Sequence, residues 1–104
     1  MLATTTEHGA VLLTGRLDVH GAAAARDALH DALVAGDGEL VVDLSGVELL
    51  DVIGLGVLVD VHRRARLAGR RLVLRGAPPR VRRLLAATRL DRVLSVERGM
   101  PVLA

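Results

Sequence analysis

The sequence predicts a single α/β domain over residues 1–104, with a mixed β-sheet of four to five strands and helices packed mainly on one face. A chain of 104 residues fits one domain. The runs Leu40–Val42 and Leu72–Leu74 are apolar without alternation, which is typical of strands in the middle of a parallel sheet. Longer amphipathic segments separate the predicted strands, and right-handed crossovers tend to place successive helices on one face.

The first half of the chain predicts a β-hairpin and a helix. Strands over Thr4–Thr6 and Ala10–Thr14 flank the turn signal His8-Gly9, so we expect them to pair antiparallel. A helix is expected over Gly21–Ala35, with Asp18 as its candidate N-cap. The apolar positions expected on one side of this helix are Ala24, Leu29 and Leu33.

The second half predicts two more helices and a closing strand. The strand at Leu40–Val42 is expected to run into a loop, after which Asp51 caps a long helix that ends at Gly69. Another helix starts at Pro78-Pro79, because proline is favoured in the first turn. A last strand is expected over Val93–Val96.

The composition excludes several classes of function. The chain has no cysteine and therefore no disulfide, thiolate metal site or cysteine nucleophile, and it has no aromatic residue to stack on bases. Its longest uncharged apolar run, Val52–Val59, is far shorter than the ~20 residues that span a bilayer. Only two serines and four scattered histidines are present, in no catalytic or metal-binding spacing. We expect a cytoplasmic, non-enzymatic protein with no cofactor, metal or membrane insertion.

The charges are unevenly distributed along the chain. Residues 1–62 carry two arginines and ten acidic residues, a balance of −8, whereas residues 63–104 carry twelve arginines and two acidic residues, a balance of +10. The basic half could bind an acidic partner or nucleic acid. We favour the alternative, in which its arginines form a solvated face and pair with the acidic half inside one small fold.

The segment Asp51–Gly56 is the strongest candidate for a functional surface. Asp51 is expected to accept hydrogen bonds from free backbone N–H groups of the helix start. Gly54 and Gly56 each cost a helix about 1 kcal/mol relative to Ala, which suggests a close backbone approach to the sheet or to another protein. The first two turns are apolar nearly all round, so they are either buried against neighbouring helices or exposed as a partner surface.

These motifs together resemble the STAS domain, the fold of bacterial anti-sigma factor antagonists. The resemblance extends over almost the whole chain. It is carried by Gly15-Arg16-Leu17-Asp18, the strand Val41–Val47, Asp51-x-x-Gly54-Leu55-Gly56-Val57-Leu58, His62–Arg66, Gly69–Leu74, Pro79–Leu85 and Leu90–Leu94.

The resemblance implies a mechanism and also marks a departure from it. Family antagonists bind an anti-sigma factor, a kinase of the histidine-kinase ATPase type, which phosphorylates a Ser or Thr at the second position after the helix-starting Asp. Here that position is Ile53, and Val52 beside it has no hydroxyl either, so phosphorylation at this place is excluded. Ser45 is interpreted as a turn residue rather than a substitute acceptor.

We therefore expect a protein-binding regulator of transcription that sequesters an anti-sigma factor of the histidine-kinase-like ATPase type and is not switched by phosphorylation. It would act as a monomer or weak dimer, without nucleic acid. The alternative is a STAS module in another assembly, such as a sensory scaffold or a transport complex. The expected partner-binding residues are Asp18, Asp51, Val52, Ile53, Gly54, Leu55 and Gly56.

Overall fold

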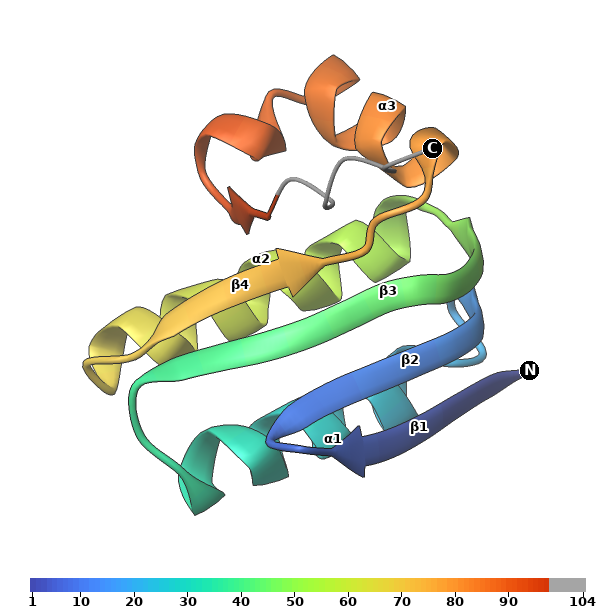
Figure 1. The fold of residues 1–104 in the computed structure, drawn as a ribbon. Coiled ribbons are helices and arrows are strands. Elements are labelled where there is room, and N and C mark those ends of the chain that lie inside the picture. The colour runs from blue at the N-terminus through green and yellow to red at the C-terminus, as the bar shows by residue number, and fades with distance from the viewer. Residues whose placement is uncertain (98–104) are drawn as a thin grey trace, which may run out of the picture.

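The computed structural model describes residues 1–97 and confirms the predicted α/β architecture (Figure 1). The sheet has five strands in the order β1-β2-β3-β4-β5; the first pair is antiparallel and the other pairs are parallel. The elements are β1 Leu2–Glu7, β2 Ala10–Leu17, α1 Ala22–Ala35, β3 Glu39–Leu50, α2 Val52–Leu67, β4 Arg71–Arg75, α3 Pro79–Ala87, the 3-10 helix η1 Leu90–Arg92 and β5 Ser95–Val96. Residues 98–104 of the predicted domain lie outside the described range.

The hairpin of β1 and β2 forms where the sequence predicts it. His8 and Gly9 both have positive φ, 51° and 80°, and Glu7 pairs with Ala10 across the turn. Two consecutive residues of positive φ match the right-handed twist of the flanking strands, and glycine adopts this conformation without steric cost.

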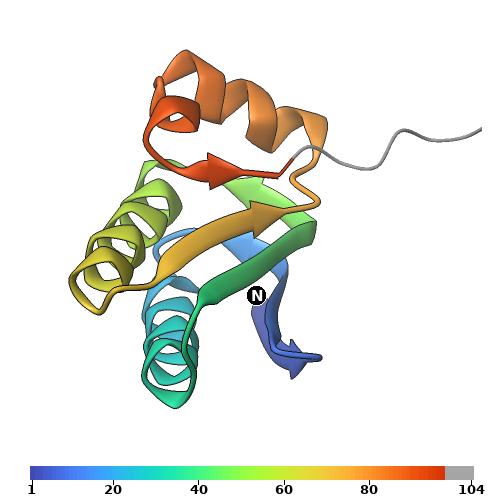
Figure 2. The ribbon, with the colours of Figure 1, turned by 60° about the vertical axis from the view of Figure 1, so that its left-hand side comes forward.

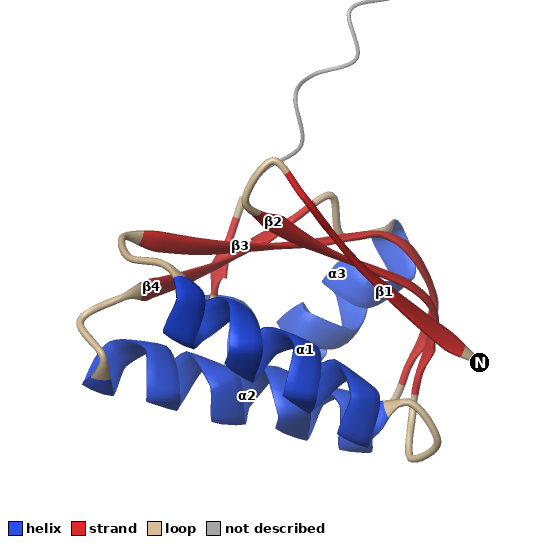
Figure 3. Cartoon of the chain, turned by 90° about the horizontal axis from the view of Figure 1, so that it is seen from below, coloured by secondary structure: helices blue, strands red, loops and turns tan. Residues whose placement is uncertain are grey.

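The helices cover one face of the sheet, as predicted. Helices α1 and α2 lie side by side beneath it (Figure 3). Helix α3 and η1 lie at the end of the sheet formed by β4 and β5 (Figure 2). Buried residues of all three helices and of β2, β3 and β4 belong to a single apolar core. Its largest fully buried side chains are Leu13, Leu17, Leu29, Leu40, Leu44, Leu58, Leu72, Leu74 and Leu85. None of the helices within residues 1–97 is long and apolar enough to cross a membrane.

Several local predictions are wrong in detail. The N-cap of α1 is Gly21 rather than Asp18, and Ala25 rather than Ala24 is buried on the inner side of this helix. The predicted loop after Val42 is instead a continuation of β3, which runs to Leu50. β5 is confined to Ser95–Val96, since the residues before it complete η1 and its cap.

Two register shifts between β2 and β3 explain why the second half of β3 does not look like a strand in the sequence. Leu12 pairs with Asp43 but Thr14 pairs with Gly46, so two residues of β3 oppose one of β2. The second shift follows Gly15. Such bulges bend a strand and release polar residues from regular alternation.

Arg70, which follows α2, ties the end of α1 to the sheet. Its guanidinium donates to five backbone carbonyl oxygens over distances of 2.8–3.1 Å, so all five N–H donors are used. Because α1 has no basic residue in its own last turn, Arg70 supplies the cation that the negative helix end favours. The acceptors are Ala32, Leu33, Asp37, Gly38 and Glu39.

We expect Arg70→Ala to lower the free energy of unfolding by about 2 kcal/mol, because hydrogen bonds to a charged group are lost and α1 carbonyls lose their partner. Arg70→Lys should recover little, since an ammonium lacks the planar five-donor geometry. Urea unfolding followed by circular dichroism measures both. Arg63→Ala is the control, because Arg63 is exposed and in no ion pair within residues 1–97. Equal effects at the two positions would contradict this role.

Candidate functional site

The candidate site begins where β3 turns into α2. The Oδ1 atom of Asp51 accepts a hydrogen bond from the backbone N–H of Gly54 at 3.0 Å, and Asp51 is the N-cap of α2. The predicted capping role is therefore confirmed. The cap fixes the direction in which the first turn of α2 leaves the sheet.

The first turn of α2 is partly exposed. Val52 is 77% exposed and Ile53 47%, and Gly56 is also at the surface. Gly54 and Leu55 point the other way and are buried, Leu55 to 5% exposure. Of the two interpretations of this apolar segment, exposure therefore holds for Val52, Ile53 and Gly56, and burial in the chain's own core holds for Gly54 and Leu55.

The two glycines of α2 have different environments. A Cβ at Gly54 would collide with the carbonyl oxygen of Leu17 and with the side chain of Leu50. The predicted close approach to the sheet is confirmed at this position. A Cβ at Gly56 would meet nothing within 4 Å. Nothing in residues 1–97 therefore requires a glycine at position 56, although it weakens the helix.

The Asp18 loop lies next to the start of α2. Leu17 and Leu50 are register partners at the ends of the parallel strands β2 and β3, so the loops that follow them leave the same edge of the sheet. The Oδ1 atom of Asp18 accepts a hydrogen bond from the backbone N–H of His20 at 3.0 Å, which forms an Asx turn.

Sequence reasoning missed one residue of this surface. Val19, between Asp18 and His20, is 63% exposed. An apolar residue inside a polar turn between a strand and a helix is the signal that could have revealed it. The site surface therefore comprises the exposed residues Val19, Val52, Ile53 and Gly56, with Asp18 and Asp51 ordering its two loops.

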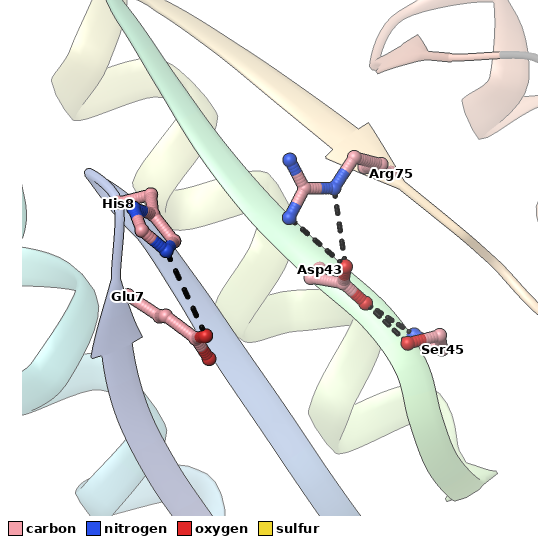
Figure 4. Close-up of polar contacts among 5 residues, drawn as sticks. All are labelled: Glu7, His8, Asp43, Ser45 and Arg75. Carbon is pink, nitrogen blue, oxygen red and sulfur yellow. Dashed lines mark hydrogen bonds and ion pairs between the residues drawn. The ribbon is translucent and has the colours of Figure 1, made fainter.

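Ser45 lies in β3 at the first bulge, not in a turn as predicted. Its hydroxyl donates to Oδ1 of Asp43 at 2.5 Å, and its backbone N–H donates to the same oxygen at 2.8 Å (Figure 4). Arg75 on β4 pairs with the other carboxylate oxygen, Oδ2, at 3.1 Å. The three residues stabilise the bulge on the sheet face opposite α1 and α2.

This arrangement changes the acidity of Asp43. Partial burial would raise the pKa of its carboxyl, but the two hydrogen bonds from Ser45 and the Arg75 guanidinium outweigh that effect and hold the pKa below its usual value of 3.8. At the candidate site's helix, burial and the nearby Arg66 cation lower the pKa of His62 below 6.5. Both shifts favour the form that dominates at neutral pH, ionised for Asp43 and neutral for His62.

The charge asymmetry is partly neutralised by ion pairs within the fold. Arg64 pairs with Asp60, Arg71 with Glu39 and Arg75 with Asp43, each joining the basic half to the acidic half. The favoured interpretation is correct for these arginines. The arginines of α3 and η1 form no ion pair within residues 1–97; they are Arg80, Arg82, Arg83 and Arg92. The same residues hold no cluster of three or more potential metal ligands.

We expect Asp43→Asn to lower the free energy of unfolding by roughly 1 kcal/mol at pH 7, since Arg75 is 43% exposed and solvent screens the pair. A folded-state pKa below the unfolded value stabilises the protein above that value, and this contribution is lost as pH falls through the folded pKa. The difference between wild type and variant should therefore be smaller at a pH well below 3.8, the usual pKa of an Asp carboxyl, than at pH 7. Urea unfolding at both pH values tests this, with the exposed Asp31→Asn as control. A difference independent of pH would contradict it.

Comparisons with known proteins agree with this geometry. The family described as "Mlab, STAS domain" matches residues 1–97. An anti-sigma-B factor antagonist of Listeria monocytogenes is 30% identical over 92 residues, which cover 88% of this chain and 81% of that protein. The crystal structure of an anti-sigma factor antagonist from Mycobacterium paratuberculosis aligns with a TM-score of 0.71 and 26% identity, over 99% of this chain and 86% of that one.

The fold also occurs in a protein of another kind. A sulfate transporter family protein from Wolinella succinogenes aligns with a TM-score of 0.72 at 18% identity, over 88% of this chain and 79% of that chain, which shows a shared fold alone. The family match extends from β1 through β5 and includes both loops of the candidate site. The resemblance found in the sequence is confirmed, and the chain belongs to the STAS domain family.

Proposed function

We propose that this chain is a non-enzymatic regulator that acts as an anti-sigma factor antagonist and sequesters an anti-sigma factor of the histidine-kinase-like ATPase type in the cytoplasm. The whole chain, residues 1–104, acts as one domain and binds neither nucleic acid nor cofactor. The similarity to the Listeria antagonist supports the class of partner. The exposed first turn of α2 and the adjoining Asp18 loop support the place of contact.

The observation that carries the proposal is the contrast between Gly54 and Gly56. Gly54 is explained by the packing of α2 on β2, whereas Gly56 has open space around it. A solvent-exposed glycine in a helix lowers stability by about 1 kcal/mol, and no contact within the described residues 1–97 requires a glycine at this position. Because glycine has no side chain, the backbone of a partner can approach α2 closely at position 56, about one turn after the exposed Val52.

Ile53 distinguishes this antagonist from one that is switched by phosphate. Its side chain is 47% exposed on the same turn as Val52, so it adds apolar contact area to the surface. It offers no hydroxyl to a kinase, and Ser45 is on β3 with its hydroxyl bonded to Asp43. We propose that this chain stays binding-competent, because position 53 cannot accept phosphate. Adding ATP to the complex therefore does not release the chain from the anti-sigma factor.

The binding surface is tested by enlarging Gly56. We expect Gly56→Leu to weaken binding to the cognate anti-sigma factor at least tenfold, an effect of about 1.4 kcal/mol, because the new side chain keeps the partner backbone away from α2. Folding should not suffer, since the Cβ of the new side chain meets nothing within 4 Å and leucine favours a helix more than glycine does. Isothermal titration calorimetry with the purified ATPase measures the affinity, and urea unfolding measures the fold.

The matched control is Ala35→Leu, which enlarges an exposed position at the far end of α1. Binding should be unchanged there. If both variants bind as the wild type does, the surface is placed wrongly. If wild-type protein binds none of the histidine-kinase-like anti-sigma factors of its source organism, the proposed function itself is wrong.

The missing switch is tested by Ile53→Ser. With ATP, the purified anti-sigma factor should leave the wild-type protein unmodified and bound, and mass spectrometry should find no added phosphate. The variant restores a hydroxyl on the first turn of α2, and we expect it to be phosphorylated and released, because roughly two negative charges on a contact surface repel and desolvate the partner. Phosphorylation and release of the wild type would contradict the proposal.

The second candidate function is that of a STAS module in another assembly. The shared fold with a sulfate transporter family protein is the observation in its favour. The same exposed turn of α2 would then contact a transport subunit or a scaffold. Co-purification with such subunits, together with unchanged transcription after deletion, distinguishes this function from the first.

A further inference from the structure

The outer edge of the sheet at β1 is open. β1 is the first strand in the sheet order, and within residues 1–97 it pairs with β2 alone. The opposite edge, β5, is only two residues long and is contacted by η1. The six residues of β1 contain no proline and no lysine, and their register with β2 is unbroken. Of the devices that usually protect an edge strand from another strand, the described β1 lacks proline, lysine and a bulge, and its one charged residue, Glu7, lies at its end.

The direction of the free backbone groups of β1 follows from its pairing with β2. The carbonyl oxygen of Met1 points toward β2, because it accepts from the backbone N–H of Arg16 at 3.2 Å. The backbone N–H and C=O groups of successive residues in an antiparallel strand point alternately toward and away from the neighbouring strand. Glu7 pairs with Ala10 next to the two-residue turn, so its backbone groups also point toward β2. The residues that direct both backbone groups outward are therefore Leu2, Thr4 and Thr6.

The outward backbone groups of β1 can form hydrogen bonds with the same groups of a second β1. When two copies of β1 run antiparallel with Thr4 opposite Thr4 of the second copy, Leu2 lies opposite Thr6 and all three outward residues meet outward residues. Ala3 then lies opposite Thr5 in the pairs without hydrogen bonds. Glu7 is the one charged residue of β1, and it falls beyond these pairs, so no like charges face each other.

We propose that β1 pairs with β1 of a second copy of this chain, centred on Thr4, to form one continuous sheet across a two-fold axis. The contact is isologous, because the same edge serves both copies. Helices α1 and α2 remain on one side of the joined sheet. A strand edge buries less area than the 1,200–2,000 Å² of stable complexes, so the dimer is weak and depends on concentration. This inference is independent of the anti-sigma factor proposal.

Cysteine cross-linking tests the register. The chain has no native cysteine, so Ala3→Cys and Thr5→Cys each introduce a single thiol. In the proposed dimer, residues 3 and 5 of different copies have Cα atoms about 4.5 Å apart, whereas two copies of the same residue are about 8 Å apart, too far for a disulfide. An equimolar mixture, oxidised at several hundred micromolar, should therefore give mainly the mixed disulfide.

Each variant oxidised alone is the matched control and should stay largely monomeric. Mass spectrometry counts the three dimers. Random collision produces the mixed species at half of all dimers, with the two homodimers making up the rest. That statistical ratio, or no cross-linking in the mixture, would overturn the proposal.

A second test uses the backbone donor itself. Thr4→Pro removes an outward N–H that has no partner within residues 1–97 of the monomer, and proline is tolerated at such edge positions. We expect this variant to keep the free energy of unfolding within about 0.5 kcal/mol and to lose concentration-dependent mass in sedimentation equilibrium. Thr4→Ala keeps the N–H and should still dimerise. Wild-type protein that stays monomeric at the highest concentration would refute the pairing.

Discussion

The backbone of α2 comes so close to β2 at Gly54 that any side chain there would collide with the Leu17 carbonyl oxygen. This approach fixes the depth at which α2 lies against the sheet. The Asp51 cap then sets its rotation, because the carboxylate holds the N–H of Gly54 itself. With both fixed, Leu55 points into the core while Val52 and Ile53 point outward. The candidate surface is thus a consequence of how the helix packs.

Much of this fold can be predicted from local sequence. The hairpin turn, the long helix with its Asp51 cap and the apolar strand at Leu72–Leu74 all follow from turn chemistry, capping and hydrophobic runs. The extension of β3 to Leu50 cannot be found in this way. The two bulges break the alternation after Ser45, where the buried residues Leu44, Val47 and Leu50 are three positions apart instead of two.

Contacts between distant parts of the chain set the other limit. Arg70 stabilises carbonyls more than thirty residues earlier, and nothing near it in the sequence shows this. The sequence predicts Asp51–Gly56 as one surface together with Asp18, but packing divides that segment. Gly54 and Gly56 have identical chemistry, and only their neighbours in space bury one against β2 and leave the other exposed.

The position of Ile53 determines how such a protein can be regulated. A hydroxyl at a contact surface allows a kinase to add charge and so to release the partner. An isoleucine instead contributes apolar contact area that a kinase cannot modify. In the proposed complex, phosphorylation at this position is absent, so we expect control to act on the partner, through its abundance or conformation. In that proposal the Asp51 cap and the Gly54 contact hold the first turn of α2 in place, and the partner is the regulated component.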